Sequence, residues 1–464
     1  MFRSCKVYAT SREGETGLRR RGGRAVECRP VPSRRRGTWP VNSAAAAAPA
    51  VTVVGIGADG WDGLPAASRT ALREADVLIG GGRQLALLPP ECAGARTPWP
   101  TPLRPAVPRL LAEHAGRRVA VLASGDPFFH GIGRALAEEL DVPSGALRAL
   151  PHPSSVSHAC ARLGWPVEDT ETVTLVGRPL ARLTAALHDG RRLLVLSAGS
   201  GTPAEVAALL RERGFGPTRM RVLEQLGGPD ERLGEPGTAD DWRQPPGAAL
   251  NLVALECRRA PGATRLSAVP GQPDEAYEHD GQLTKRHVRA VTLAALAPAP
   301  GELLWDVGGG SGSIAIEWMR THRTCRALTV ERDPVRAERI AGNADRLGVP
   351  GLRVVQGAAP GALDELPTPD AVFIGGGLTV PGMLERCWEA LPEGGRLVAN
   401  TVTLESEALL ASWHRAHGGD LVRIAVSHAA PVGGFTGWRQ AMPVTQWSVT
   451  RGPVQQATTG ASRA

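Results

Sequence analysis

Two glycine-rich turns constrain this chain more than any other feature of its sequence. The stretches "VTVVGIGADG", residues 51–60, and "LLWDVGGGSGSIAIEW", residues 303–318, each place a short apolar run before a cluster of glycines. In the second stretch an apolar, helix-like run follows, so the pattern predicts a strand, a tight turn and a helix. Such a turn can hold a dinucleotide, a phosphate or S-adenosylmethionine.

Apolar runs alternate with amphipathic stretches on both sides of a segment rich in Pro, Gly and Ala. This alternation predicts the α/β class, and 464 residues allow more than one core. The last two strands are expected as a late pair, "DLVRIAVS" and "QAMPVTQWSVT", around Gly433 to Gly437. We predict a tail, a first α/β domain, a linker, a second α/β domain and a C-terminal tail, at residues 1–49, 51–258, 259–276, 277–450 and 451–464.

The positive charge is concentrated at the start of the chain. The net charge is +7, and residues 1–40 hold Lys6 and ten arginines against three glutamates. The rest is close to neutral, which argues against a nucleic-acid surface on the folded part. The Arg-rich head lacks apolar periodicity, so we expect a disordered tail, or an upstream start that is not used.

Membrane and metal partners are not expected. No apolar run reaches the roughly 18 residues of a membrane span. The seven cysteines are widely scattered, with no CxxC pair and no metal-ligand spacing. This pattern fits the reducing environment of the cytoplasm.

The second glycine cluster fits a methyltransferase better than a dinucleotide-binding protein. From Gly308 the chain reads GGGSGS, which lacks the last glycine of GxGxxG but matches DxGxGxG when Asp306 is included. Glycines permit positive φ, and the N–H groups of a helix start favour a carboxylate such as that of S-adenosylmethionine. Glu331 ends the next strand, where a carboxylate can accept hydrogen bonds from ribose hydroxyls. A tight turn without ligand and a solvated acid are the weaker alternatives.

The segment after the fourth strand of this domain is informative for what it lacks. Methyltransferases that act on the exocyclic amines of bases usually carry Asn/Asp-Pro-Pro-aromatic there. The sequence "DAVFIGGG", residues 370–377, offers only space and backbone groups. This composition suits a bulky substrate that is methylated on carbon.

In the first domain, three segments follow predicted strands and offer ligand contacts. Gly55 and Gly57 end the first strand, and "LASGDPFFHGIG" presents Asp126 after another. Ser154 and Ser155 stand at a helix start in "PHPSSVSHACARLGWP". Hydroxyls at this position can cap the helix or bind a ligand, and the two alternatives stay equally open.

These residues carry a resemblance to known families that spans residues 51 to 450. The segments "SGDP", "SAGSGTPAEVAALLRERGFG" and "LEQLGGPDERL" look like a tetrapyrrole (precorrin) methylase domain. The segments "GQLTKRHVRAV", "DVGGGSG", "VERDP", "QGAAPGAL" and "LPEGGRLVAN" look like its methyltransferase and decarboxylase partner, a Rossmann-like class I domain. In this order they resemble the fused, decarboxylating precorrin C(5,15)-methyltransferases of cobalamin synthesis.

Two positions depart from the pattern of these families. His152 and Pro153 stand where Gly and an aliphatic residue usually precede the two serines. Gly309 stands where Ala or Cys is common, a departure that we expect to change little.

The resemblance implies a reaction and a division of labour. The family methylates a precorrin at carbons 5 and 15 and removes carbon dioxide from the carbon-12 acetate, giving precorrin-8X. By analogy the first domain methylates carbon 5, the second performs the other two steps, and each binds one S-adenosylmethionine. The domain families associate, so a homo-oligomer is expected. Family matching puts these residues around the two cofactors: Gly55, Gly57, Asp126, Ser154, Ser155, Thr284, Gly308, Gly309, Gly310, Ser311, Gly312, Glu331 and Ala359.

The implied chemistry requires few catalytic side chains. The sulfonium is a strong electrophile and the macrocycle an electron sink, so alignment in a dry cleft can supply much of the acceleration. We therefore expect no catalytic triad and assign no general base. Carboxylates of the substrate call for cations. The candidates, for which a role as solvated surface charge is equally open, are Lys285, Arg286, His287, Arg289 and Arg439.

Two other functions compete with this reading. An RNA methyltransferase is the nearest rival enzyme, supported mainly by the basic tail and opposed by the near-neutral body. A non-catalytic scaffold that binds S-adenosylmethionine is the other, opposed by two intact cofactor motifs.

Overall fold

The computed structural model describes residues 51–140 and 145–452. The predicted tail at 1–49 and the C-terminal tail from residue 453 lie outside these residues. Helices and strands alternate through the described part, so the predicted α/β class is confirmed. No helix in the described part has the length and apolar character needed to cross a membrane.

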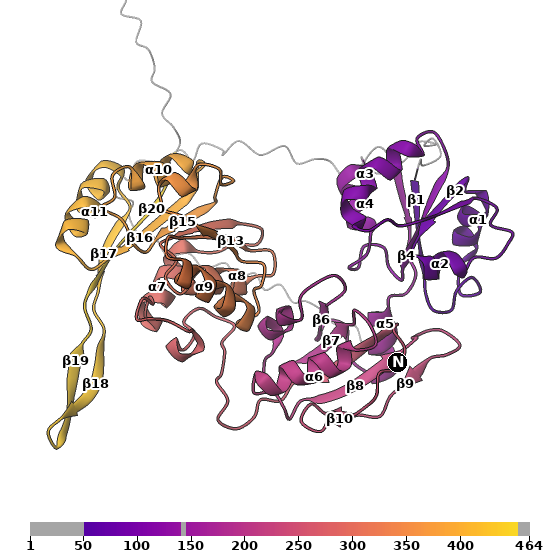
Figure 1. The fold of residues 1–464 in the computed structure, drawn as a ribbon, viewed down its shortest axis with the longest axis horizontal. Helices are drawn as coiled ribbons and strands as arrows, with labels where there is room; N and C mark the ends of the chain where they lie inside the picture. Colours follow the sequence, from indigo (N-terminus) through magenta and orange to yellow (C-terminus); the bar gives the residue numbers. More distant parts are fainter. Residues whose placement is uncertain (1–50, 141–144, 453–464) are drawn as a thin grey trace, which may run out of the picture. The chain divides into compact units, whose positions relative to one another are not determined.

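A five-stranded parallel sheet opens the described chain, and one of its inner strands leads into the first glycine turn. β1 (Val51–Ile56) lies between β4 (Val119–Ser124) and β5 (Leu147–Leu150). The three inner strands, β2 (Val77–Gly80), β4 and β1, are apolar and largely buried on both faces, as a parallel sheet covered by helices requires (Figure 1). The other elements are β3 (Ala95–Pro98), α1 (Ala66–Glu74), α2 (Gly82–Ala86), α3 (Leu103–Glu113) and α4 (Gly133–Glu139).

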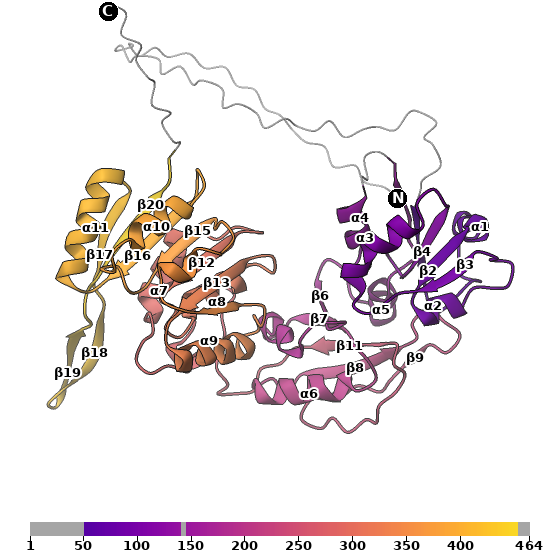
Figure 2. The same cartoon turned by 45° about the horizontal axis from the view of Figure 1, so that its top comes forward.

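Helix α5 (Ser155–Leu163) leads into a mixed six-stranded sheet of order β10-β8-β11-β7-β6, with β9 beside β8. Helix α6 (Thr202–Glu212) covers one face of this sheet (Figure 2). Its Val206 and Leu210 are fully buried and pack in one core with Val253. The remaining elements are β6 (Thr170–Thr174), η1 (Leu180–Ala186), β7 (Arg192–Leu196), β8 (Arg219–Glu224), β9 (Arg232–Leu233), β10 (Gly237–Thr238) and β11 (Asn251–Glu256).

A seven-stranded, doubly wound sheet follows, in the order β14-β13-β12-β15-β16-β20-β17. Strand β12 (Leu303–Val307) stands where the strand order reverses, which is where open α/β sheets bind ligands. β20 (Val444–Thr450) runs antiparallel to both of its neighbours, β16 and β17, and the other strand pairs of this sheet are parallel. The other elements are η2 (Asp274–Ala276), α7 (Arg286–Leu296), α8 (Ser313–Thr321), β13 (Arg326–Glu331), α9 (Pro334–Arg346), β14 (Arg353–Gln356), η3 (Gly361–Leu363), β15 (Ala371–Ile374), α10 (Met383–Ala390), β16 (Arg396–Thr401), α11 (Leu404–His417) and β17 (Asp420–Ile424).

The end of this domain holds one hairpin more than the sequence pattern predicts. β17 and β20 pair with each other as expected, but β18 (Ser427–Val432) and β19 (Phe435–Gln440) form a separate two-stranded hairpin between them. Figure 1 shows this hairpin, in yellow, projecting beyond the sheet. The glycines at 433–434 turn the inner hairpin, and the connections at its base contain no glycine, so the sequence pattern was interpreted as one pair of strands.

Candidate functional site

The second glycine turn adopts a backbone that only glycine accepts readily. Gly308, Gly310 and Gly312 have φ values of +78°, +59° and +75° between the end of β12 and the start of α8. A Cβ on Gly308 would lie 3.1 Å from the backbone nitrogen of Gly376, in the glycine run after β15. The two glycine segments therefore adjoin at the carboxyl edge of the sheet.

Gly309 is constrained by a different contact, while the expectation that its departure from the family pattern changes little stays a prediction. A Cβ at this position would lie 2.1 Å from Cγ2 of Thr329 and 2.9 Å from Cδ1 of Ile340. Both atoms belong to buried side chains. The Gly at 309 is therefore matched to the Thr at 329, which fills the space that an alanine methyl would need.

Glu331 ties the glycine turn to the end of β13. Its side chain is buried; Oε2 accepts a hydrogen bond from the Gly310 N–H at 2.9 Å, and Oε1 accepts one from the Asp333 N–H at 3.0 Å. A carboxylate can accept about four hydrogen bonds, so Glu331 retains acceptor capacity. It can therefore hold the turn and accept ribose hydroxyls together.

The turn also offers donors that suit the carboxylate of S-adenosylmethionine. Gly312 is the N-cap residue of α8 and offers no side-chain cap. The Ala315 N–H bonds the carboxylate of Asp306, which leaves the N–H groups of Ser313 and Ile314 for a ligand. The buried Oγ of Ser311 has no hydrogen-bond partner among the described residues. Together with Glu331, these groups fit an amino-acid carboxylate at one end and a ribose at the other.

Asp306 is buried at the end of β12, where its carboxyl group contacts Thr329 rather than solvent. The side chain is 1% exposed, and Thr329 Oγ1 donates to its Oδ2 at 3.3 Å. Burial raises the pKa of Asp306 to about 7, because the charged form loses its hydration. Its role is therefore structural, even though the sequence motif begins with it.

A loop spanning residues 278–285 covers the glycine turn and contains Thr284. A Cβ on Gly310 would lie 3.1 Å from the carbonyl oxygen of Gln282. Asn343 fixes this loop: its fully buried Nδ2 donates to the carbonyl oxygens of Glu278 and Ser311, each at 2.9 Å. Sequence reasoning missed Asn343, because a single amide inside a helix carries no motif.

A second clamp holds the same loop from its exposed side. Oδ2 of Asp280 accepts from Nε of Arg336 on α9 at 2.8 Å and lies 3.1 Å from a guanidinium nitrogen of Arg339. The Arg336 hydrogen bond is the main reason that the pKa of Asp280 lies far below its usual range. Ala359, which follows β14, is half-buried at this carboxyl edge.

Arg289 does not fit the role of a substrate-binding cation. Its side chain is fully buried, Nε donates to Oε1 of Glu317 at 2.5 Å, and its other nitrogens bind Asp274, Thr284 and Gln272. All of its donors face partners inside the protein. The expectation that Arg289 binds substrate is therefore contradicted by its burial.

The acid partner of Arg289 also anchors part of the predicted linker. Backbone N–H groups of Gly271 and Gln272 donate to Glu317 at 2.6 and 3.0 Å, and the Tyr277 hydroxyl donates at 2.8 Å. This segment is packed onto α8 rather than exposed. Because Arg289 also donates to the carbonyl oxygen of Thr284, the same buried network holds the end of the loop at 278–285.

The remaining predicted cations are exposed, and the fold gathers two of them. Lys285, Arg286 and His287 stand at the start of α7. Arg439 on β19 pairs in register with His428 on β18, and the rings of His428 and His287 lie 5.7 Å apart between centroids. Sequence reasoning missed His428, because a lone histidine in an exposed strand has no spacing signal.

In the first domain, three loops meet at the carboxyl ends of β1, β4 and β5. A Cβ on Gly55 would lie 1.9 Å from the carbonyl oxygen of Gly125 and 2.7 Å from the backbone nitrogen of His152. A Cβ on Gly125 would lie 2.9 Å from Cα of Ser154. The backbones therefore approach as closely as glycine allows, and the predicted residues of all three loops adjoin.

A histidine and an aspartate link two of these loops. Nε2 of His152, whose side chain is 5% exposed, lies 3.0 Å from Oδ2 of Asp59. The ring also passes Gly57, where a Cβ would lie 3.0 Å from two ring atoms. His152 therefore fills the space beside Gly57, and neither His152 nor Asp59 was predicted to contribute to this site.

The polar residues of the first site make local hydrogen bonds. Ser154 caps α5 by accepting from the Ser157 N–H at 3.1 Å, whereas Ser155 is exposed. Oδ1 of Asp126 accepts from the Phe128 N–H at 2.8 Å. Ser154 thus has the capping role, and the ligand contacts predicted for Asp126 and Ser155 stay predictions.

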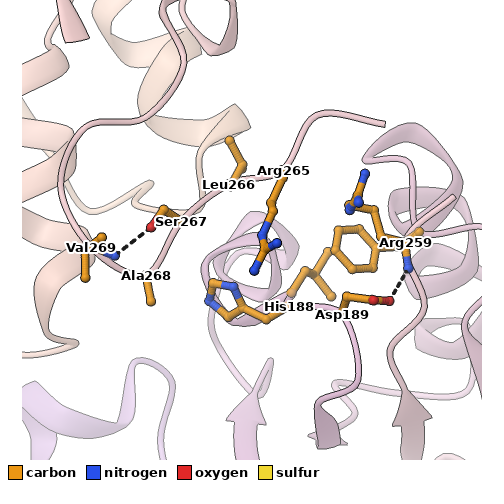
Figure 3. Close-up of a pocket in the computed structure, with 10 residues that line it drawn as sticks. His188, Asp189, Arg259, Arg265, Leu266, Ser267, Ala268 and Val269 are labelled. Carbon is orange, nitrogen blue, oxygen red and sulfur yellow. Dashed lines mark hydrogen bonds between the residues drawn. The ribbon is translucent and has the colours of Figure 1, made fainter. Parts of the chain in front are cut away.

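A cavity of about 390 Å³ lies elsewhere, beside residues 265–269 (Figure 3). The backbone N–H of Arg259 donates to Oδ1 of Asp189 at its wall, at 2.9 Å. None of the predicted site residues lines it. The described residues also hold no group of three or more His, Cys, Asp or Glu that could bind a metal ion.

These two folds and sites define a class: a tetrapyrrole methylase fold joined to a doubly wound methyltransferase domain. Residues 50–241 match the family model of tetrapyrrole (corrin/porphyrin) methylases, and residues 275–451 match that of the precorrin methyltransferase domain. A relative from Sinorhizobium sp named precorrin-6Y C(5,15)-methyltransferase [decarboxylating] is 49% identical over 87% of this chain and 97% of its own. The chain belongs to this family.

One further relative agrees with that assignment, and a solved structure is similar in sequence to part of the chain. The protein of the same name from Mycobacterium tuberculosis is 48% identical over 86% of this chain and 100% of its own. The crystal structure of the C-terminal domain of precorrin-6Y C5,15-methyltransferase from Rhodobacter capsulatus is 52% identical. That match covers 40% of this chain and 100% of the other, with a TM-score of 0.39.

Proposed function

We propose that this protein methylates a precorrin at carbons 5 and 15 and decarboxylates its carbon-12 acetate. The observation that carries the proposal is the presence of two glycine-lined sites, each at the carboxyl ends of parallel strands in a different sheet. The first site, around Gly55, serves carbon 5. The second, around Gly308 and Glu331, serves carbon 15 and the decarboxylation.

The proposal includes one S-adenosylmethionine for each domain, which would supply the methyl group as an electrophile. In the second domain, Glu331 accepts the ribose hydroxyls, the start of α8 takes the carboxylate, and the loop at 278–285 excludes water from the turn. The open glycine run at 375–377 leaves room for a macrocycle. In the first domain, the backbone around Gly55 and Gly125 allows the cofactor to approach closely.

Product analysis tests this function directly. The full chain is incubated with S-adenosylmethionine and the reduced form of precorrin-6Y, either metal-free or carrying cobalt, and the products are weighed by mass spectrometry. The expected product has gained two methyl groups and lost one carbon dioxide. Unchanged substrate in both forms would refute the proposal, and the preferred form identifies the natural substrate.

The proposed setting is the cytoplasm, without nucleic-acid or membrane partners. The five cysteines of the described part, all buried, are free thiols: Cys92, Cys160, Cys257, Cys325 and Cys387. The net charge after residue 40 is close to zero, which does not favour a nucleic-acid partner. The proposed domain limits are 51–258 and 277–450, as the sequence predicts.

We also propose that the protein is a homo-oligomer built through the projecting hairpin. A two-stranded hairpin is marginally stable by itself, and its free edges favour pairing with another chain. Trp438 is 80% exposed on the hairpin face that also carries Ala429, its partner in register. A second copy that covers this face would remove a large apolar side chain from water.

A further inference from the structure

The base of the hairpin lies at the same edge of the sheet as the cofactor turn. Strands β12, β15 and β16 are parallel, so their carboxyl ends share one edge with Gly308. Antiparallel β20 begins beside Thr401, at the end of β16, and the hairpin connects β17 to that beginning. The hairpin therefore leaves the sheet from its cofactor edge.

Helix α7 brings its N-terminus to this edge as well. Near the C-terminus of α7, the carbonyl of Leu296 accepts from Nε of Arg396 at the start of β16, at 2.7 Å. One helical turn earlier in α7, Oγ1 of Thr292 accepts a hydrogen bond from Nδ2 of Asn400, near the end of β16, at 2.8 Å. The helix thus runs antiparallel to β16, and His287 in its first turn reaches the base of the hairpin.

Three side chains that can carry positive charge meet there. The His287 and His428 rings lie 5.7 Å apart, and Arg439 is directly opposite His428 in the hairpin. Directly opposed residues of an antiparallel pair project from the same face, so Arg439 shares the face that His428 turns to α7. No carboxylate of the described residues forms an ion pair with any of the three, whereas the neighbouring cations Arg289 and Arg423 each have one.

The same face of the hairpin continues with small and apolar residues. By the two-residue period of strands, it carries Ala430 opposite Gly437 and then Val432 opposite Phe435. The Val432 side chain leans over Gly437, where a Cβ would lie 2.9 Å from its Cγ2. Val432 and Phe435 are 62% and 84% exposed. Trp438, which serves the proposed oligomer contact, lies on the opposite face.

We propose that this face is the tetrapyrrole-binding surface of the second domain, with His287, His428 and Arg439 holding a carboxylate of the substrate. These three side chains form no ion pair with the described residues, the small and apolar residues beyond them suit a macrocycle, and the surface opens at the cofactor edge. The proposal rests on the proposed function and adds His428 and the hairpin to its site. Their role is to bind and orient the substrate, not to transfer a proton.

The test compares His428→Gln and Arg439→Gln with Arg415→Gln in the full-length protein. Arg415 is an exposed cation in the last turn of α11, which leads into the start of β17 at the opposite edge. Each test variant should raise KM for the tetrapyrrole in the second methylation roughly tenfold, the effect of losing a hydrogen bond to a charged group. KM for S-adenosylmethionine and the values for Arg415→Gln should stay unchanged. Arg439→Lys should recover part of the loss.

A binding experiment separates failure of this site from failure of the proposed function. Uroporphyrin, which carries eight carboxylates, is titrated into the wild type and into His428→Gln/Arg439→Gln, with no turnover required. Weaker binding by the double variant supports the site, whereas equal binding, or an unchanged KM in both single variants, overturns it. Inorganic phosphate that competes as well as the porphyrin would indicate a simple anion site and would also overturn the tetrapyrrole assignment.

Discussion

The carboxylate of Glu331 accepts the backbone N–H of Gly310 at 2.9 Å, so this side chain shapes the glycine turn and, in the proposed function, also accepts the ribose hydroxyls. Glu331→Ala removes both functions. Because hydrogen bonds to a charged group contribute about 1.5–3 kcal/mol, we expect cofactor affinity in the second domain to fall ten- to a hundredfold. The product should then be singly methylated and still carboxylated, as seen by mass spectrometry.

The control for this experiment is Glu338→Ala, which removes an exposed acid from the same region, on α9. Its products should match those of the wild type. Doubly methylated, decarboxylated product formed by Glu331→Ala at the normal rate would refute the assignment of Glu331 to the cofactor.

The contact between Gly309 and Thr329 predicts a compensating pair of substitutions. Gly309→Ala places a methyl group against Cγ2 of Thr329, and overpacking of this kind destabilises a core by about 1–3 kcal/mol. Thr329→Ser removes that methyl group but keeps the hydroxyl that donates to Asp306. The double variant should regain most of the stability, as measured by urea unfolding. If Gly309→Ala is as stable as the wild type, the predicted clash is absent.

Arg289 should behave as a structural residue. Arg289→Met leaves Glu317 buried without its cation, and breaking a buried ion pair destabilises a protein by about 3–5 kcal/mol. Arg286→Met, at an exposed position nearby, should have little effect. Hydrogen exchange of peptides from α7 and α8 provides the measurement. A stable Arg289→Met variant with a raised KM for the substrate would instead support a binding role.

The raised pKa of Asp306 predicts that the stability of the second domain depends on pH. In the unfolded chain this carboxyl ionises near pH 4, whereas in the folded protein it keeps its proton up to about pH 7. Between these values the unfolded state binds fewer protons, so rising pH removes stability, by roughly 1.4 kcal/mol per pH unit, and the loss is complete above pH 7. Hydrogen exchange of β12 at pH 5 and pH 8 should show this difference.

Asp306→Asn removes the ionisation and should make the two pH values more alike in β12 protection. Exchange that is corrected for its intrinsic pH dependence isolates the effect of this residue. A pH difference of equal size in the variant and the wild type would mean that Asp306 is not its source.

The hairpin predicts an effect on assembly that is separate from substrate binding. Trp438→Ser removes the exposed ring from the proposed contact face and should shift the protein towards monomers in light scattering after size exclusion. Val335→Ser, which replaces an apolar side chain that is 63% exposed on α9, should leave the mass unchanged. If the wild type is itself monomeric, the proposed contact does not form.

Local pattern was sufficient to predict the α/β class, the glycine turns and the position of Glu331. These features depend on residues close together in the chain, because a strand, a turn and a helix start follow from apolar periodicity and glycine alone. The spacing from Gly308 to Glu331 carried the cofactor prediction, and the structure shows the direct contact between Glu331 and Gly310 that this spacing allows.

Tertiary structure decided which charged residues are free to bind and which are not. Arg289 lies three residues after Arg286 in a cation-rich segment, yet it faces Glu317 inside the domain, because burial depends on which face of α7 packs against α8. In the same way, His428 and His287 are 141 positions apart in sequence and become neighbours only because β20 returns antiparallel and carries the hairpin to the edge where α7 begins. Sequence determined the elements and their turns; long-range packing determined which side chains those elements bring together.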